Sequence, residues 1–295
     1  KQAIKDLCIA YKKFFSGLSS KPKYKSKRKS RASFYNDALK LVVKEQRVLI
    51  EKVGWIKTSE QIPMSKKYLN PRIHFDGKYW YLAVGIEQEI LQIELSDVSL
   101  GIDVGVKELA VCSDGTRKKN INKTSYIKKI EKRLRRLQRR VSRKYEMNKE
   151  GNRFVKTSNI LKIERKIRLL HRRISNIRKN HLHQATSDIV KTKPYRILME
   201  TLNIKDMMKN KHLSKAIAKQ CLNEFKKQIK YKCLKYGIEF VEADLWYPSS
   251  KKCSECGNIK KNLKISERVF QFTCGFEVDR DLNAAINLAR YQLTN

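Results

Sequence analysis

The 295-residue sequence has no apolar run of roughly 18 residues, the length that a membrane-spanning helix needs. The first residues, KQAIKDLCIAYKKFF, also lack the shape of a signal peptide. We therefore expect a cytoplasmic protein with no membrane partner.

Acidic residues are scarce, because 29 Asp and Glu stand against 67 Lys and Arg, for a formal net charge of +38 at pH 7. The basic excess runs along nearly the whole chain, and its field attracts a polyanion at long range. Nucleic acid is therefore the leading partner. A ribosomal protein or a merely solvated basic surface would show the same composition.

The number and spacing of the cysteines do not suit a set of disulfide pairs. There are seven cysteines, an odd number, and only Cys253, Cys256 and Cys274 are grouped. This pattern argues against a disulfide framework and favours a reducing compartment with a candidate metal site. We expect the others to be small core residues, namely Cys8, Cys112, Cys221 and Cys233.

The N-terminal part of the chain changes its periodicity twice. Apolar residues at helical spacing within 1–20 predict a helix. The basic segment KPKYKSKRKSR at 21–31 is either a solvated linker or a nucleic-acid contact. From 34 to 95 apolar and polar residues alternate, and Asp76-Gly77 marks a tight turn, so we expect a small antiparallel sheet or barrel.

Buried strands are predicted in the second part of the chain. VSLGIDVGVKELAVCSDG (98–115) predicts a strand, a glycine bend and a second strand. YRILMETL (195–202), an amphipathic helix over 214–237 and the strand IEFVEAD imply a parallel strand pair with a helical crossover. Asp103 lies within the first strand, where a buried carboxylate needs a positive partner.

Two long helices are predicted between these strands. Apolar stripes over 125–179, with a Gly-Asn break at 151–152, predict an antiparallel helical hairpin. Its outer faces, as in KRLRRLQRR and HRRISNIRKN, carry too few acids to neutralise their Arg and Lys. We expect these faces to bind nucleic-acid phosphates.

Three carboxylates on separate elements are candidates for chemistry. Asp103 lies in mid-strand, Glu200 at a strand end and Asp281 at the start of the predicted helix DRDLNAAINLARYQ. Phosphodiester hydrolysis by two metal ions needs acids that converge from separate elements around the scissile phosphate. Spacing alone does not decide this, because acids near strand ends are common in α/β proteins.

The residues around these acids resemble a known family. GIDVGVKELAVCSDG, the METL after a buried strand, and CSECG followed by DRDLNAAINLA resemble the three RuvC motifs and the zinc ribbon of the TnpB (OrfB) proteins of bacterial insertion sequences. These proteins are relatives of compact type V CRISPR effector nucleases. The resemblance covers residues 34–290 and implies an α/β, ribonuclease-H-like (RuvC) fold.

The resemblance also implies a catalytic site. Asp103, Glu200 and Asp281 match the acids that hold two Mg²⁺ ions, for which Mn²⁺ can substitute. Asp279 is the alternative for the third acid. Asp281 is preferred because the family's acid lies two residues before the asparagine of this helix, here Asn283.

A domain order follows from the same resemblance. The segments are a remnant of an N-terminal helical recognition region with a basic linker (1–33), a wedge-like β-barrel (34–97), RuvC part I (98–124), the basic helical hairpin (125–180), RuvC part II (181–248), a zinc-ribbon-like segment that binds target nucleic acid (249–278) and RuvC part III (279–295). In the family, the wedge-like domain grips guide RNA and target DNA, and the hairpin lines their heteroduplex.

The zinc ribbon is incomplete. Cys253 and Cys256 form a C-x-x-C-G knuckle, but the second knuckle has only Cys274, with Phe272 in the place of the lost ligand. Either the zinc site is weakened or lost, with Phe272 as a core residue, or residues are omitted from the sequence. A fourth zinc ligand would be water, Glu255, Glu277, a distant cysteine, or absent.

We therefore expect an RNA-guided DNA endonuclease that binds a guide RNA and cleaves double-stranded DNA by two-metal-ion hydrolysis at a single RuvC-like site. One alternative is a guide-loaded protein that no longer cuts and acts as a repressor. The other is a transposase or resolvase that works without a guide.

Overall fold

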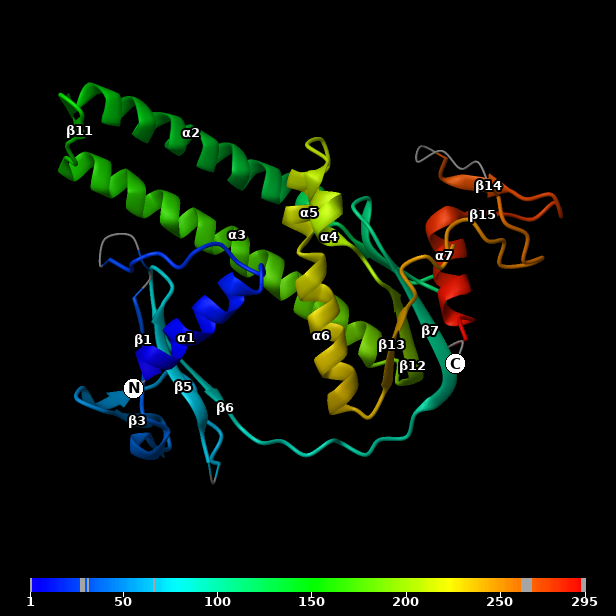
Figure 1. Ribbon diagram of the computed structural model, residues 1–295, viewed down its shortest axis with the longest axis horizontal. Helices are drawn as coiled ribbons and strands as arrows, with labels where there is room; N and C mark the ends of the chain where they lie inside the picture. The colour runs from blue at the N-terminus through cyan, green and yellow to red at the C-terminus, as the bar shows by residue number, and fades with distance from the viewer. Residues whose placement is uncertain (1, 27–29, 31, 66, 261–266, 293–295) are drawn as a thin grey trace. The chain divides into compact units, whose positions relative to one another are not determined.

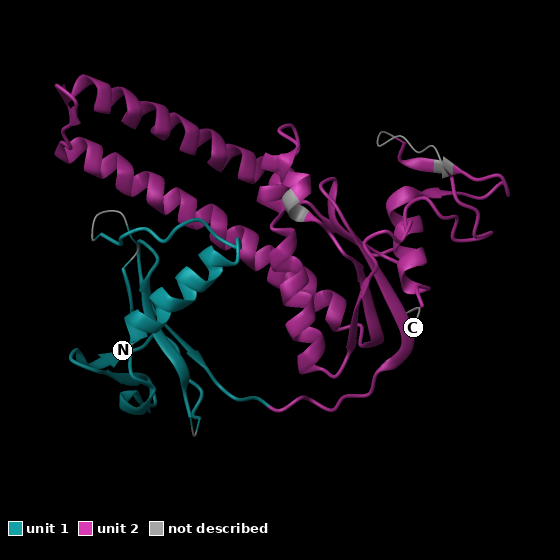
Figure 2. Cartoon of the chain, in the orientation of Figure 1, with its two compact units in different colours: residues 1–88 teal, residues 89–295 magenta. Residues whose placement is uncertain are grey.

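The computed structural model describes residues 2–26, 30, 32–65, 67–260 and 267–292. The chain forms two compact units, residues 1–88 and 89–295, each with its own hydrophobic core (Figure 2). The predictions for 27–29 and 31 in the basic segment, and for 261–266 in the ribbon, lie outside the described residues.

Among its described residues, the first unit contains the predicted helix and two three-stranded antiparallel sheets, in place of the single small sheet or barrel expected over 34–95. Helix α1 spans Gln2–Phe15. The sheets have the orders β1-β5-β6 and β2-β3-β4, with the strands β1 Ser33–Tyr35, β5 Leu69–Phe75, β6 Trp80–Gly85, β2 Val42–Lys44, β3 Arg47–Ile50 and β4 Gly54–Lys57. The predicted turn joins β5 to β6, where Asp76 Oδ1 accepts hydrogen bonds from the backbone N–H groups of Lys78 and Tyr79.

The second unit is built on a five-stranded sheet with the order β13-β12-β7-β8-β9. Its parallel strands are β7 Ser96–Val104, β12 Pro194–Glu200 and β13 Glu239–Ala243. Strands β8 (Glu108–Cys112) and β9 (Arg117–Lys119) extend the sheet in antiparallel fashion. The predicted parallel pair is therefore confirmed, with helix α6 between β12 and β13.

Helices cover the two faces of this sheet separately (Figure 1). Helices α3 and α6 pack on the face that carries Ile102 and Ile197, both fully buried. Helix α7, residues Arg280–Ala289, packs on the opposite face, where its Leu288 contacts Leu198. Because side chains alternate along a strand, residues 103 and 200 point to the α7 face.

The predicted helical hairpin is formed by α2 (Ser125–Met147) and α3 (Ser158–Val190), which lie side by side (Figure 1). The short strands β10 (Lys149–Glu150) and β11 (Arg153–Phe154) join them. Helix α3 continues past the predicted end at 179, and its last turns enter the core of the sheet. None of the described helices, α3 included, has the length and apolar character needed to cross a membrane.

The helical segment 214–237 is divided, contrary to the prediction of one helix. Helix α5 (Ser214–Gln220) ends and α6 (Leu222–Lys235) begins at Cys221, whose φ of +55° is left-handed. A further short helix, α4, spans Ile204–Lys209. Of the four cysteines expected in the core, Cys112 and Cys233 are buried, whereas Cys8 is exposed and Cys221 is half-buried at the helix junction.

Candidate active site and cysteine cluster

Asp103 and Glu200 lie side by side at one end of the sheet. In the parallel pair of β7 and β12, Met199 is opposite Ile102, so the next residues, Glu200 and Asp103, occupy neighbouring positions. Adjacent strands are about 4.8 Å apart. Both side chains are half-buried and point to the α7 face.

Helix α7 supplies the third carboxylate, because Asp281 lies in its first turn. The helix can approach β7 closely because Gly101 has no side chain. A Cβ atom at Gly101 would lie 2.0 Å from the carbonyl oxygen of Ala285 and 2.4 Å from the backbone nitrogen of Ala289. Gly101 therefore sets the separation between the helix that carries Asp281 and the strand that carries Asp103.

Asp279, the alternative third acid, is the N-cap of α7. Its Oδ1 accepts hydrogen bonds from the backbone N–H groups of Asp281 at 3.0 Å and Leu282 at 3.2 Å. Arg117 Nη2 lies 3.5 Å from the same oxygen. The cap holds the first turn of the helix in place, so Asp279 supports the position of Asp281.

Burial and mutual repulsion perturb the two strand acids. Burial, followed by the charges of Glu200 and Asp281 and to a smaller extent Asp279, raises the pKa of Asp103 well above its usual range. Burial, followed by the charge of Asp281, raises the pKa of Glu200 to about 7. Ionising neighbouring buried carboxyl groups costs free energy. Such a group of acids is typical of a cation-binding site, since a cation would favour their ionised forms.

The positive partner predicted for Asp103 is not a neighbouring side chain. Within the described part of the chain, no hydrogen bond or ion pair reaches the carboxylates of Asp103 and Glu200, and the charge of Arg280 only partly offsets the raised pKa of Asp103. Arg280 and Arg268 instead pair with Asp281 Oδ1, at 3.3 Å from Nε and 3.6 Å from Nη1.

The three carboxylates are less tightly grouped than a closed metal cage. Among the described residues, only three cysteines form a group close enough to hold a metal ion by side chains alone, and the three carboxylates do not. Mg²⁺ takes oxygen ligands and keeps several waters, so it needs only one or two direct carboxylates and the substrate phosphate. The donor set therefore fits Mg²⁺.

The structure brings the three C-terminal cysteines together. The Sγ atoms of Cys253, Cys256 and Cys274 all lie within 4.8 Å of one another, with Cys253 buried and the other two exposed. Gly257 and Gly275 follow the knuckles with φ values of +75° and +81°, a left-handed conformation that glycine adopts without strain. Three thiolates suit zinc as an incomplete tetrahedral set.

Phe272 is a buried residue, as one of the two predicted arrangements requires. Its ring packs with Cys253, Phe276 and Val278. Neither Glu255 nor Glu277 belongs to the cysteine group, and no further cysteine of the described chain joins it. The described residues therefore offer three sulfur ligands and no fourth side-chain ligand.

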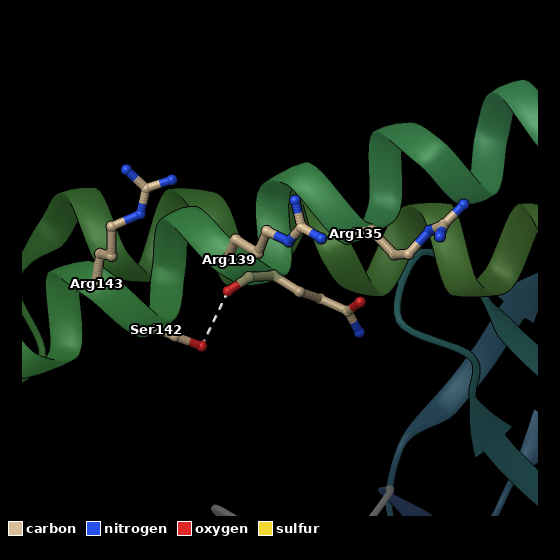
Figure 3. Close-up of a pocket in the computed structure, with 5 residues that line it drawn as sticks. Arg135, Arg139, Ser142 and Arg143 are labelled. Atoms are coloured by element: carbon tan, nitrogen blue, oxygen red, sulfur yellow. Dashed lines mark hydrogen bonds between the residues drawn. The ribbon is translucent and has the colours of Figure 1, made fainter.

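Helix α2 carries a stripe of arginines (Figure 3). Arg135, Arg139 and Arg143 follow one another at four-residue spacing and therefore share one face. They line a surface hollow of ≈ 400 Å³ with Gln138 and Ser142. We call these three residues the arginine stripe.

Acidic residues of the hairpin do not neutralise the arginine stripe. Glu131 pairs with Arg178 at 3.1 Å and with Lys219 at 2.7 Å, and Glu164 pairs with Lys156 at 2.9 Å. No ion pair to the stripe occurs among the described residues. Such uncompensated charge on one helix face is suited to a phosphate backbone.

Two features of the site were not predicted from the sequence. Gly101 lies inside a strand, and a glycine there is a known signal of close backbone approach. Asn283 and Asn287 are buried on α7 at four-residue spacing, which places both on one face of the helix. The glycine could have predicted where α7 packs on the sheet. The two asparagines could have predicted which face of α7 contacts the ribbon.

The sheet and its covering helices form an α/β fold, and its similarity to solved Cas12f structures supports a RuvC-containing fold. A CRISPR-Cas12f ternary complex matches with a TM-score of 0.52 and 22% identity, over 81% of this chain and 45% of that chain. A Cas12f1–sgRNA–target DNA complex also matches with a TM-score of 0.52 and 22% identity, over 75% and 46%. This chain thus spans about half the length of those chains.

The chain belongs to the TnpB (OrfB) family of RNA-guided nucleases. Residues 84–211 match the family described as "Probable transposase" (OrfB_IS605), and residues 223–288 match "Cas12f1-like, TNB domain". A "Putative RNA-guided DNA endonuclease" of Streptomyces pristinaespiralis is 30% identical over 294 residues, which cover 97% of this chain and 69% of the relative. InsQ of Escherichia coli (strain K12), whose name has the same wording, is 29% identical and covers 97% and 72%. The family predicted from the motifs is confirmed.

Proposed function

We propose that this protein is an RNA-guided, Mg²⁺-dependent DNA endonuclease that binds a guide RNA and cleaves double-stranded target DNA. The observation that carries the proposal is the convergence of Asp103, Glu200 and Asp281 from β7, β12 and α7, with the raised pKa values of the two strand acids. The names of the relatives support the same activity.

We assign the hydrolysis to this single RuvC-like site. Asp103, Glu200 and Asp281 would hold two Mg²⁺ ions, which supply positive charge for activating water and for stabilising the leaving oxygen. Arg280 and Arg268 hold the Asp281 carboxylate and add positive charge beside the scissile phosphate. Water attacks the phosphorus directly, so no covalent protein intermediate forms.

We also assign roles to three segments outside the nuclease site. The wedge-like segment 34–97 grips guide RNA and target DNA, and exposed aromatic side chains on its strands, Trp55 and Trp80, favour contact with bases. The hairpin 125–180 lines the heteroduplex with its arginine stripe. The segment 249–278 contacts the target, and its three cysteines would hold zinc.

Cleavage of a guide-matched DNA tests the function. Purified protein with guide RNA should cut the target in Mg²⁺ or Mn²⁺, and ribonuclease treatment before target addition should abolish the activity. No product with either ion would indicate a DNA-binding repressor. Cleavage that survives ribonuclease would indicate a transposase or resolvase that works without a guide.

The arginine stripe should contribute to nucleic-acid affinity through charge. Replacing Arg135, Arg139 and Arg143 together with glutamine should lower the slope of log affinity against log salt by about 2 to 3, because each phosphate contact contributes about 0.9. Filter binding of guide RNA and of target DNA at several salt concentrations measures the slope.

The control for the arginine stripe removes the same charge from ion-paired lysines elsewhere. These lysines are Lys118, Lys209 and Lys226, which lie outside the segments 34–97, 125–180 and 249–278. Their triple glutamine variant should keep the wild-type slope. Equal losses in both triple variants would show that net charge, and not the stripe, determines affinity.

The raised pKa of Glu200 predicts a pH-dependent stability of the metal-free protein. Its carboxyl has an ordinary pKa of 4.5 and a folded pKa of about 7, so the folded state keeps a proton that the unfolded chain has released. The stabilisation is full below pH 4.5 and is lost as the pH rises through about 7. With a chelator present, the unfolding temperature of wild type should therefore fall relative to that of Glu200→Gln between about pH 5 and about pH 8. Parallel curves for the two proteins would contradict the assignment.

Restoring a cysteine should strengthen the zinc site. Phe272→Cys should raise bound zinc to about one ion per chain, because a fourth thiolate completes a tetrahedral set. Elemental analysis after zinc loading and dialysis measures the content. Phe276→Cys is the control, since Phe276 packs on Phe272 but does not occupy the ligand position. Unchanged zinc in Phe272→Cys would mean that the site is already complete or is dismantled.

A further inference from the structure

The buried asparagines of α7 hold the first cysteine knuckle by its backbone. Asn283 is fully buried, and its Nδ2 donates to the carbonyl oxygen of Lys252 at 2.7 Å. Its Oδ1 accepts from the backbone N–H of Ser254 at 2.9 Å. One side chain therefore binds the residues immediately before and after Cys253.

The next turn of α7 repeats this contact. Asn287, 3% exposed, donates from Nδ2 to the carbonyl oxygens of Ser249 at 2.8 Å and Lys252 at 2.6 Å. Arg290, at the C-cap of α7, donates to the carbonyl oxygen of Ser254. Positions 283, 287 and 290 lie on one face of a helix, so α7 presents a continuous polar stripe to the knuckle.

Helix α7 is consequently held from two sides. Its apolar side, with Ala285 and Leu288, packs on the sheet at Gly101. Its polar stripe binds the knuckle, whose Cys253 is buried. Asp281 lies two residues before Asn283, in the first turn of the same short helix. A displacement of the knuckle relative to α7 would therefore also displace the helical turn that carries Asp281.

We propose that Asn283 and Asn287 are positioning residues that join the cysteine knuckle to the helix carrying Asp281, so that the knuckle keeps its place with only three sulfur ligands. These hydrogen bonds keep Cys253 buried in a ribbon that has Phe272 in place of a ligand. It rests on the proposed nuclease function for its effect on Asp281, but its effect on Cys253 is independent of that function.

Thiol labelling tests the knuckle without any cleavage assay. In zinc-stripped protein, Asn283→Ala and Asn287→Ala should each let a maleimide reagent label Cys253 about tenfold faster or more, because local opening becomes easier when buried hydrogen bonds are lost. Digestion that includes a cut after Glu255, followed by mass spectrometry, separates Cys253 from the exposed Cys256 and Cys274. Labelling of Cys253 within about twofold of wild type would overturn the proposal.

The matched control is Asn258→Ala. Asn258 is an exposed asparagine of the same ribbon, and its side chain donates to Thr273 Oγ1 and not to α7. Asn258→Ala should label at the wild-type rate. Asn287→Ala leaves both hydrogen bonds of Asn283 in place, so it serves as the test variant if Asn283→Ala fails to fold.

The metal dependence of cleavage tests the link to Asp281. Asn283→Ala should need about tenfold more Mn²⁺ for half-maximal cleavage while guide-RNA affinity stays unchanged, because a displaced Asp281 holds the cation less well. A purely structural loss would lower the active fraction and leave the half-maximal Mn²⁺ concentration unchanged. If wild type does not cleave, the nuclease proposal fails, and the labelling result alone decides the role of the asparagines.

Discussion

Asp281→Ala should reduce guide-directed cleavage by roughly 10³-fold or more while leaving guide-RNA affinity within about twofold of wild type. A metal-bound transition state receives several kcal/mol from its carboxylate ligands, and about 4 kcal/mol corresponds to this factor. Asp281 is the α7 acid whose charge acts on both Asp103 and Glu200. Single-turnover cleavage at saturating guide and Mg²⁺, with filter binding of the guide, measures the two quantities.

Asp279→Asn is the matched control for this variant. The amide oxygen still accepts hydrogen bonds from the backbone N–H groups of Asp281 and Leu282, so the helix cap is preserved while the charge is removed. We expect this variant to cleave within about tenfold of wild type. A loss as large as that of Asp281→Ala would make Asp279 the third metal-binding acid, and cleavage by Asp281→Ala would remove Asp281 from the site.

Gly101→Ala should displace α7 and abolish cleavage. Its new methyl group would lie 2.0 Å from the carbonyl oxygen of Ala285, which belongs to the helix backbone and cannot move aside alone. Forcing extra volume into a packed interior costs about 1–3 kcal/mol, and the helix that carries Asp281 must shift away from Asp103. We expect the unfolding temperature to fall by roughly 3–10 °C.

Gly105→Ala distinguishes this steric effect from a general need for glycine in the motif. A Cβ atom at Gly105 would meet only the carbonyl oxygen of Glu108, at 3.7 Å, which is ordinary van der Waals contact. Thermal unfolding and cleavage of the two variants should be measured together. Normal activity and stability of Gly101→Ala would show that α7 does not pack on β7 as described.

Local sequence patterns predicted most elements but not the break at Cys221. No glycine or proline marks this position, and its neighbours have helical spacing. The left-handed φ of Cys221 is kept by tertiary contacts, since buried Gln220 donates to the carbonyl oxygens of Gly105 at 2.9 Å and Glu108 at 3.3 Å. A residue that bonds to a distant loop leaves no periodic signal in its own segment.

The end of α3 was missed for a related reason. Its last turns contain polar residues that face the core, which hides the apolar stripe. Thr186 is fully buried but bonds to Gln228 Oε1 at 3.1 Å and to Lys232 Nζ at 2.7 Å, both from α6. Buried polar groups are tolerated when they are paired, and their partners here lie more than forty positions away in the sequence.

The sequence by itself determined the basic charge, the type of nearly every element, the family and the identity of the candidate acids and cysteines. These follow from residue types and from spacings within one segment, which local periodicity expresses directly. Only the tertiary structure decided that Asp279 caps α7, that the charge of Asp281 raises the pKa of both Asp103 and Glu200, and that Asn283 binds the backbone on either side of Cys253. Such contacts depend on how a helix packs against a glycine in a distant strand, and that packing distance is a property of the folded core and not of any one segment.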